Sequence, residues 1–232
     1  MDRNIKLSDR LNKVASFIPH GTFFADIGSD HAYLPCSICL QDITAQAIVG
    51  EVNEGPLQRA RETVSNNHLT DRIDVRLGDG LDILQPGEVS AVVIAGMGGS
   101  LIQSILEKGK LRLKGVGRII AQPNNDERNV RSWFSSHGYV ITNEVILEEN
   151  GFLYEIITGD KQVEGQTLSE RQQLFGPRLL EHKSNLFRKK WERELMKRRR
   201  IIDQMQRAKA PDVSKIAIFE KESKWIKEVL EA

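Results

Sequence analysis

Apolar and polar positions show two different periodicities along the first two thirds of the chain, one typical of helices and one typical of strands. Apolar residues at positions 7, 11, 14, 15 and 18 have helical spacing, and Pro19 and Gly21 end this helix. Short apolar or alternating runs predict strands at 22–27, 45–51, 72–77, 89–95 and 116–121. Helical patterns follow four of these strands, at 33–41, 56–64, 101–106 and 130–134. Strands that alternate with helices favour an α/β fold with a mostly parallel sheet.

The pattern changes after the last of these helices. Residues 139–147 and 152–157 are typical of a terminal antiparallel hairpin around a turn at 148–151, and a polar linker follows at 159–166. Pro177 is predicted to start a long helix to about position 205, whose apolar steps of three, four and seven suit a coiled-coil seam. Pro211 breaks it, and a second, antiparallel helix is expected at 213–229. The chain therefore divides into an α/β domain, 1–160, and a helical coiled-coil domain, 161–232.

The charge is distributed unevenly between these two domains. Residues 1–160 hold 15 Lys and Arg against 21 Asp and Glu, a net −6, whereas residues 161–232 hold 18 against 11, a net +7. A basic appendage on an acidic domain suggests a polyanionic partner, although a solvated helix face or a dimer seam is an alternative. Arg10 and Lys13, on the polar face of the first helix, are further candidates for phosphate contact. The basic candidates in the appendage are Arg188, Lys189, Lys190, Arg193, Lys197, Arg198, Arg199 and Arg200.

Composition restricts the class of protein. The chain has 232 residues, of which 40% are hydrophobic, enough for a packed core. It contains no apolar run of membrane-spanning length and no signal peptide, so a cytoplasmic protein is expected. Cys36 and Cys39 have C-x-x-C spacing, but no second pair exists to complete a metal site. They are expected to be small buried hydrophobes, and no metal is expected.

Acidic residues stand where three predicted strands end. Asp26 closes the first strand and precedes Gly28, whose missing side chain lets a backbone turn pass close to a ligand. Glu51 ends the second strand, 25 residues later, where an acid receives the two ribose hydroxyls of an adenosine ligand. Asp79 lies between two glycines after the third strand and suits an exocyclic amine. An ordinary turn or an accidental acid is the alternative at each position.

Two further turns carry candidate chemistry. Residues 96–99 contain three glycines, which indicates a close backbone approach or a sharp bend. Gln122, Asn124 and Asn125 follow the fifth strand, and their amides both donate and accept hydrogen bonds, as reading a base edge requires. A simple turn at 122–126 is an equal alternative, because Pro, Asn and Asp favour turns.

Three of these segments resemble one known family. D-I-G-S-D-H-A-Y-L-P (26–35), V-I-A-G-M-G-G (93–99) and Q-P-N-N (122–125) are similar to the bacterial tRNA (adenine-22-N1)-methyltransferases. The first segment departs from the general methyltransferase motif D-x-G-x-G-x-G, since Asp30 and Ala32 replace two glycines, but it matches this family. The likeness covers residues 5–158, and the helical tail is similar in kind.

The resemblance implies a Rossmann-like class I domain that binds S-adenosylmethionine and methylates N1 of an adenine in the D-arm region of tRNA. Methylation of a protein or another RNA, or a non-catalytic RNA-binding sensor, are the competing readings. A monomer or weak dimer is expected. The donor site implied for this chain is Asp26, Gly28, Asp30, His31, Glu51, Asn53, Asp79, Gly80, Gly96, Met97, Gly98 and Gly99.

Adenine N1 has a lone pair that can attack the sulfonium methyl group directly, so positioning is expected to supply most of the rate. N1 lies on the Watson–Crick edge, so the base must be unpaired or flipped out. Our hypothesis is that Gln122, Asn124 and Asn125 hold the adenine beside the turn at 96–99. Asp30 or His31 is the candidate for taking a proton from N6 after transfer, and a structural role for His31 is the alternative.

Overall fold

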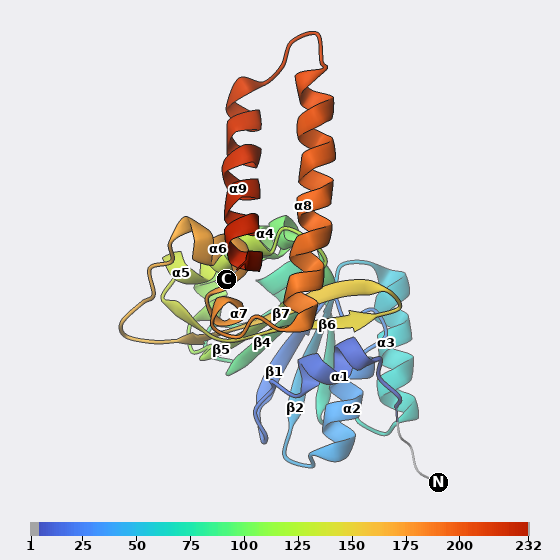
Figure 1. Cartoon of the computed structure of the whole chain (residues 1–232). Helices are drawn as coiled ribbons and strands as arrows, with labels where there is room; N and C mark the ends of the chain where they lie inside the picture. The colour runs from blue at the N-terminus through green and yellow to red at the C-terminus, as the bar shows by residue number, and fades with distance from the viewer. Residues whose placement is uncertain (1–4, 232) are drawn as a thin grey trace. The chain divides into compact units, whose positions relative to one another are not determined.

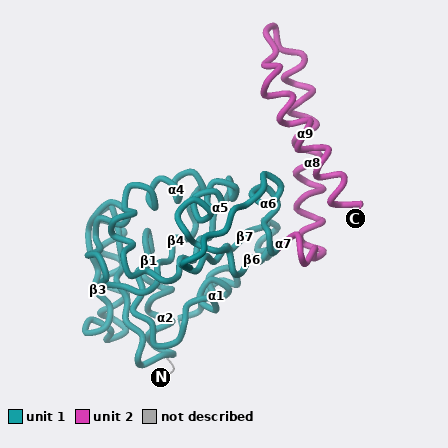
Figure 2. The backbone as a smooth tube through the Cα atoms, turned by 90° about the vertical axis from the view of Figure 1, so that its left-hand side faces the viewer, with its two compact units in different colours: residues 1–178 teal, residues 179–232 magenta. Residues whose placement is uncertain are grey.

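The computed structural model describes residues 5–231; residues 1–4, at the start of the expected α/β domain, and residue 232 lie outside the described residues. The chain forms two compact units, Met1–Arg178 and Leu179–Ala232 (Figure 2). This division falls later than the change in composition at position 160. Residues beyond 160 still pack with the first unit: Leu168 belongs to its core, and Ser135 Oγ donates to the carbonyl of Gln166 at 2.5 Å.

The first unit is built around one seven-stranded sheet with the order β3-β2-β1-β4-β5-β7-β6 (Figure 1). The strands from β1 to β5 pair in parallel, and β7 is antiparallel to both β5 and β6. This confirms the expected α/β fold with a terminal hairpin. The strands are β1 (Phe23–Ile27), β2 (Gln46–Glu51), β3 (Ile73–Leu77), β4 (Ala91–Met97), β5 (Arg118–Pro123), β6 (Tyr139–Glu149) and β7 (Phe152–Lys161).

Helices cover both faces of the sheet and enclose two hydrophobic cores (Figure 1). One core packs β-strand residues against α1 (Asp9–Ala15), α2 (Tyr33–Gln41) and α3 (Glu54–Asn66). The other packs them against α4 (Gly99–Lys108), α5 (Glu127–Ser136) and the short 3-10 helix η1 (Gly80–Ile83). A second 3-10 helix, η2 (Lys110–Leu113), precedes β5, and α6 (Glu170–Phe175) follows β7.

Two sequence features at the N-terminal side are clear in the structure. Ser8 caps α1, because its side chain accepts a hydrogen bond from the Leu11 amide at 3.3 Å. Cys36 and Cys39 are free and fully buried in the core beside α2. Burial raises the pKa of these thiols to about 12 and about 11, so both stay protonated and pack as small apolar groups.

The second unit is a pair of helices, α8 (Asn185–Gln206) and α9 (Val213–Glu231), which run antiparallel (Figure 1). Phe187, Trp191 and Leu195 are the buried residues of α8, and Ile216, Ile226 and Val229 are buried on α9. The expectation of one helix from Pro177 was wrong. Pro177 starts only α7 (Pro177–Glu181), and Ser184 then caps a separate helix by accepting from the Phe187 amide at 3.2 Å.

Candidate active site

The expected site residues of the first unit lie at the carboxyl edge of the parallel strands. Because β1, β2, β4 and β5 are parallel neighbours or near neighbours, the turns that follow them meet at the same edge. A ligand in this crevice contacts turns that are far apart in sequence.

The turn after β1 is shaped by left-handed backbone conformations. Gly28 has φ +72°, Asp30 has φ 59° and Ala32 has φ 56°. The Gly28 amide donates to the carbonyl of Gly50 at 2.8 Å, and the Asp30 amide donates to the Glu51 carboxylate. The turn is therefore fastened to the end of β2, although two of its left-handed positions are not glycine.

Asp26 and Glu51 are both buried at this edge, with exposed fractions of 4% and 6%. Burial, reinforced by the nearby charge of Glu51, raises the pKa of Asp26 to about 7, although a 2.5 Å hydrogen bond from Ser29 Oγ opposes this shift. Burial also raises the pKa of Glu51. Two buried carboxylates so close together favour a ligand that brings positive charge and hydrogen-bond donors.

The remaining residues of the expected donor site are more open. Asp30 is exposed, and its carboxylate lies 3.6 Å from both Arg59 and His31, whose ring stacks on Tyr33 with centroids 5.0 Å apart. Asn53 precedes α3 and is exposed. Asp79, also exposed, lies 3.9 Å from Lys108, and Gly80 has φ +56°.

The turn after β4 touches the turn after β1. A Cβ placed on Gly28 would lie 2.1 Å from Cε of Met97, so the end of the Met97 side chain occupies the space beside the Gly28 backbone. Gly99 starts α4 against the backbone of the β5 turn, since its Cβ would lie 2.2 Å from the Asp126 carbonyl oxygen. The β1, β4 and β5 turns thus form one continuous surface.

Gln122 and Asn124 are held in a dense hydrogen-bond network at the end of β5. Gln122 is completely buried, and its Oε1 accepts from the Gly96 amide at 3.0 Å and from Arg10 Nη1. Its Nε2 donates to the Pro123 carbonyl at 3.0 Å and to Asn124 Oδ1 at 3.1 Å. Asn124 Nδ2 in turn donates to the Gly96 carbonyl at 2.7 Å.

This network changes the interpretation of Gln122. Its amide is occupied by the protein on both sides, so the structure differs from the expectation that it reads a base edge: Gln122 orients the exposed Asn124 instead. Asn125 is also exposed at this turn, and its carbonyl accepts from the Gly99 amide at 2.9 Å.

Arg10, a candidate for phosphate contact on the polar face of α1, directs its guanidinium toward the end of β5. Its guanidinium bonds Gln122, lies 5.5 Å from the centre of the Tyr154 ring, and has Nε 3.9 Å from Glu149. Sequence reasoning did not place Arg10 at this site and did not single out Tyr154. The spacing of α1 gave no sign that one polar position reaches across to β5, and Tyr154 lay within an ordinary strand pattern.

Comparison with known proteins identifies the family. The family model described as tRNA (adenine(22)-N(1))-methyltransferase matches residues 24–228. A Bacillus subtilis tRNA (adenine(22)-N(1))-methyltransferase is 44% identical over 209 residues, covering 88% of this chain and 87% of the relative. The chain belongs to the tRNA (adenine(22)-N(1))-methyltransferase family.

Solved structures agree with this family assignment. A Streptococcus pneumoniae protein crystallised with S-adenosyl-L-methionine has a TM-score of 0.87 and 39% identity, over 97% of this chain and 100% of that one. The Mycoplasma capricolum protein named TrmK, crystallised with S-adenosyl-homocysteine, has a TM-score of 0.83 and 29% identity, over 97% and 98%. The protein is a methyltransferase of this family and uses S-adenosylmethionine.

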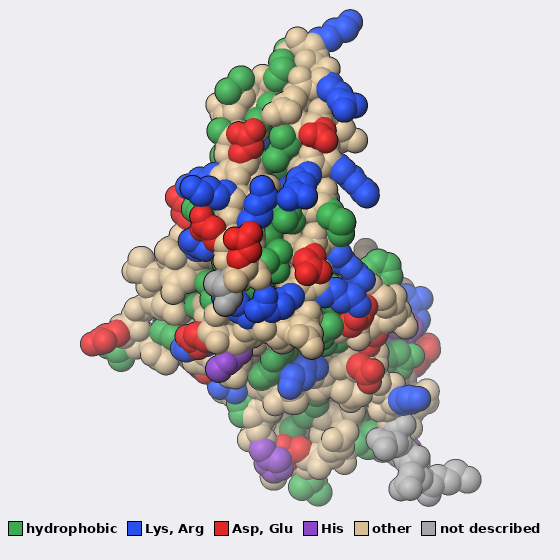
Figure 3. Space-filling model, viewed as in Figure 1, with side chains coloured by type: hydrophobic (Ala, Val, Ile, Leu, Met, Phe, Trp, Pro, Cys, Tyr) green, Lys and Arg blue, Asp and Glu red, His purple; other side chains and the backbone are tan. Residues whose placement is uncertain are grey.

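The basic candidates of the helical unit fall into two groups. Arg198 is largely buried and pairs with Glu194 at 2.5 Å and with Glu222 at 3.2 Å. Arg188 donates to the Leu230 carbonyl at 2.7 Å. These two arginines hold the helices together. Lys189 and Lys190 are half-buried, whereas Arg193, Lys197, Arg199 and Arg200 are exposed. Lys and Arg side chains gather along this unit in the space-filling view (Figure 3).

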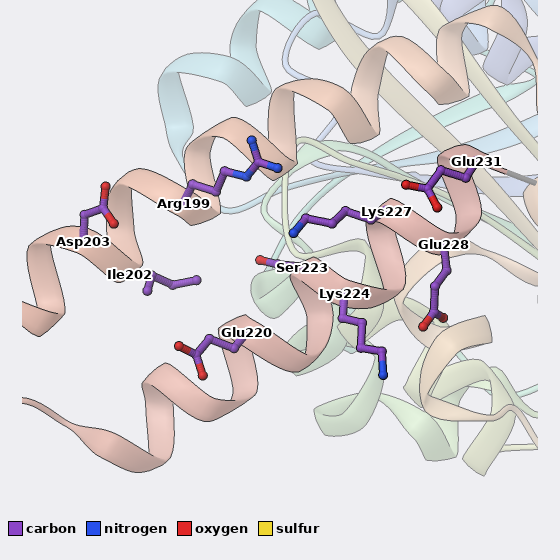
Figure 4. A pocket seen from close by; sticks show the side chains of 9 residues that line it. All are labelled: Arg199, Ile202, Asp203, Glu220, Ser223, Lys224, Lys227, Glu228 and Glu231. Atoms are coloured by element: carbon purple, nitrogen blue, oxygen red, sulfur yellow. The ribbon is translucent and has the colours of Figure 1, made fainter.

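Two hollows of the helical unit differ in charge. The groove between α8 and α9, about 430 Å³, is lined by four acids and three bases, with Ile202, Ser223 and Lys227 pointing toward the space between the helices (Figure 4). The outer face of α8 carries a hollow of about 460 Å³, whose charged lining is entirely basic: Arg193, Lys197 and Arg200, beside Met196 and Ile201. The outer face is the better surface for phosphates.

The described residues contain neither a cluster of metal-ligating side chains nor a helix of membrane-spanning character. Within residues 5–231, no group of three or more His, Cys, Asp and Glu side chains is arranged to hold a metal ion. The helices in the same part of the chain include none that is long and apolar enough to cross a membrane.

Proposed function

We propose that the protein transfers a methyl group from S-adenosylmethionine to N1 of adenine 22 in tRNA, and that the turns at residues 26–31, 96–99 and 122–125 form the reaction centre. The observation that carries this assignment is the contact of Met97 with Gly28. It joins the turn with the buried acids to the β4 turn, and Asn124 of the β5 turn donates to the Gly96 carbonyl of that β4 turn, so a donor and an adenine bound to these turns are neighbours.

The donor side fits S-adenosylmethionine by its chemistry. A buried carboxylate at Asp26 suits the ammonium group of the methionine part, and Glu51 suits the two ribose hydroxyls. Asn53, Asp79 and Gly80 lie on the adenine side of this site. Asp30 is fastened to Glu51 through its amide and faces Arg59 and His31, so we assign Asp30 and His31 to donor binding rather than to proton removal.

The acceptor side has to place one ring nitrogen. S-adenosylmethionine supplies an electrophilic methyl group, and the adenine N1 lone pair is free to attack it without prior loss of a proton. Asn124 is the exposed amide that can hold the adenine edge, with Gln122 and the Gly96 carbonyl fixing its orientation. Rate then comes from holding the reacting atoms at about 3–3.5 Å in line.

The tRNA is bound, in this proposal, by exposed cations outside the reaction centre. These are Lys13 on α1 and the basic outer face of α8 that contains Arg193, Lys197 and Arg200. We further propose that the protein acts in the cytoplasm, as a monomer or weak dimer.

The test uses unmodified tRNA incubated with the protein and S-adenosylmethionine labelled in the methyl group, followed by mass analysis of the nucleosides. The expected result is label in N1-methyladenosine from position 22. A tRNA with 1-deazaadenine at position 22 is the matched control, because it lacks only the accepting nitrogen, and it should gain no label. Label in another nucleoside would contradict the target atom. No label, from folded protein that still binds the donor, would favour a protein substrate or a sensor.

A further inference from the structure

The β6–β7 hairpin extends beyond the end of β5. Antiparallel pairing matches Arg118 with Asp160 and Ala121 with Ile157, so residues of β7 before Ile157 lie past the paired part of β5. The hairpin continues there, with Leu147 opposite Tyr154 and Glu149 opposite Phe152. The tip of the hairpin therefore lies at the carboxyl edge of the sheet, where Asn124 follows β5.

Tyr154 faces the same side of the sheet as Gln122. Ile156, two residues along β7, belongs to the core under α1, and side chains two apart on a strand share a face. Arg10, from α1, lies over the Tyr154 ring and bonds Gln122 with the same guanidinium. The Arg10 guanidinium therefore connects the aromatic ring to Gln122, which holds Asn124.

Two features lie next to the Tyr154 ring: a hydrogen bond that ties α1 to the hairpin, and a second aromatic ring, that of Phe152. The Arg10 amide donates to Glu149 at 2.9 Å, which ties α1 to the hairpin and lowers the pKa of Glu149. Phe152 lies with its ring centre 6.5 Å from that of Tyr154, and it is 66% exposed. An aromatic pair on the hairpin that runs past the end of β5 matches the way proteins hold unpaired bases, by stacking on rings and on arginine planes.

We propose that Tyr154 is the stacking surface for the target adenine, that Phe152 extends this surface to an adjacent base, and that Arg10 is a positioning residue for Tyr154. This inference rests on the proposed function. It adds to the acceptor site two aromatic residues that lie outside the three sequence motifs. Stacking on Tyr154 can hold any base, whereas the amide of Asn124 forms hydrogen bonds to the edge of one kind of base. In this proposal Tyr154 holds the base and Asn124 recognises it.

The first test compares Tyr154→Leu, Tyr154→Phe and Phe152→Leu. Losing the ring in Tyr154→Leu should lower kcat/KM for tRNA about 5- to 150-fold, the range of one lost base stack, while the dissociation constant of S-adenosylmethionine stays unchanged. Tyr154→Phe keeps the ring and should retain nearly full activity. Phe152→Leu should raise KM for tRNA with little change in kcat. Wild-type kcat/KM in Tyr154→Leu would overturn the proposal.

A second test reads stacking without methyl transfer. A tRNA with 2-aminopurine in place of the target adenine is bound to each variant, and its fluorescence is measured, because stacking on an aromatic ring quenches this base. Wild type and Tyr154→Phe should quench it, and Tyr154→Leu should leave it brighter. Equal fluorescence in all three would refute the stacking role, even if the nucleoside assay succeeds. A failed nucleoside assay would refute the proposed function and leave this readout intact.

Discussion

Asp26 gives the donor edge a pH dependence of its own at the residue scale. Folding raises the pKa of this carboxyl from 3.8 to about 7, so the native state holds the proton more tightly than the unfolded state. The resulting contribution to the free energy of unfolding is fully present below about pH 4 and is lost as the pH rises through 7. We expect wild type to lose more stability between pH 5 and 8 than Asp26→Asn, measured by urea unfolding. Equal slopes would contradict the assignment, and the exposed Asp71→Asn is the matched control.

Donor affinity should change in the opposite direction across the same pH range. If ionised Asp26 binds the ammonium group, affinity for S-adenosylmethionine rises as the pH passes 7, and this rise is absent in Asp26→Asn. Glu51 is the neighbouring acid that also faces the donor, and its own raised pKa adds to the slope in both proteins. Titration calorimetry at several pH values measures the difference between them.

Asn124 should matter for turnover more than for donor binding. Its side chain spans Gln122 and the Gly96 carbonyl, so Asn124→Ala removes both the contact to the base and the brace of the β4 turn. We expect kcat to fall ~10- to 100-fold with little change in donor affinity, since misplacement of a reacting atom is costly. The exposed Asn143→Ala on β6 is the control. Equal losses in kcat and donor affinity would place Asn124 in the donor site instead.

Some residue positions at the candidate site could be predicted from the sequence, and others could not. The positions of Asp26, Glu51 and Gly28 at the carboxyl edge were predictable, because each lies at the end of a clear strand pattern. The inward course of Arg10 was not, because Arg10 and Gln122 are 112 positions apart and only the packing of α1 brings them together. Gln122 and Asn124 carry the same amide group, so the sequence does not distinguish them, yet Gln122 is buried and Asn124 is exposed.

The turns between elements depend on glycines that pack against backbone. Gly99→Ala places a Cβ 2.2 Å from the Asp126 carbonyl oxygen, and backbone cannot move aside as a side-chain tip does. We expect a loss of about 1–3 kcal/mol in the free energy of unfolding, with weaker donor binding. Gly117→Ala, whose Cβ would lie at an ordinary 3.8 Å from the Ser90 carbonyl oxygen at an exposed position, should change the free energy of unfolding by no more than about 0.5 kcal/mol. Similar urea midpoints for the two variants would refute this account.

A buried ion cluster joins α5, the hairpin and α6. Arg131 is fully buried, bonds Glu144 at 2.6 Å and Glu155, and donates to the Leu174 carbonyl at 3.2 Å. Arg131→Met leaves two buried carboxylates without their cation, so we expect a loss of about 3–5 kcal/mol in urea unfolding. Arg131→Lys keeps the charge but not the fork of donors and should lose less. A loss below about 1 kcal/mol in Arg131→Met would mean that the cluster is not stabilising.

The element boundaries were largely predictable from hydrophobic pattern, except where capping decides them. Strands with continuous apolar runs, such as β4, need two covered faces, and only a sheet between helices supplies them. The break at residues 182–184 was not predicted, since the apolar spacing continues from Leu179 through Leu186. A serine that satisfies the first amide groups of α8 was enough to start a new helix there.

Residues 161–232 carry a net charge of +7 on a molecule whose remaining part is acidic, and the basic residues of the helical unit are not equivalent. Arg188 and Arg198 are largely covered and bond within the unit. Lys197, which lies 3.7 Å from Glu194 but is exposed, and Arg200 line the basic hollow on the outer face of α8. Lys224 and Lys227 line the mixed-charge groove between the helices (Figure 4). Two double variants, Lys197→Gln with Arg200→Gln and Lys224→Gln with Lys227→Gln, therefore change the net charge equally but on different surfaces.

The two double variants separate phosphate contact from net charge. If the outer face binds tRNA, its variant weakens binding and reduces the slope of log Kd against log salt by about 2, because each lost phosphate contact removes roughly 0.9. The groove variant should leave the slope nearly unchanged, and donor affinity should be the same in both. Equal changes in slope would mean that long-range charge acts rather than contact. An unchanged slope together with altered sedimentation of the outer-face variant would instead indicate that this face binds a second copy of the chain.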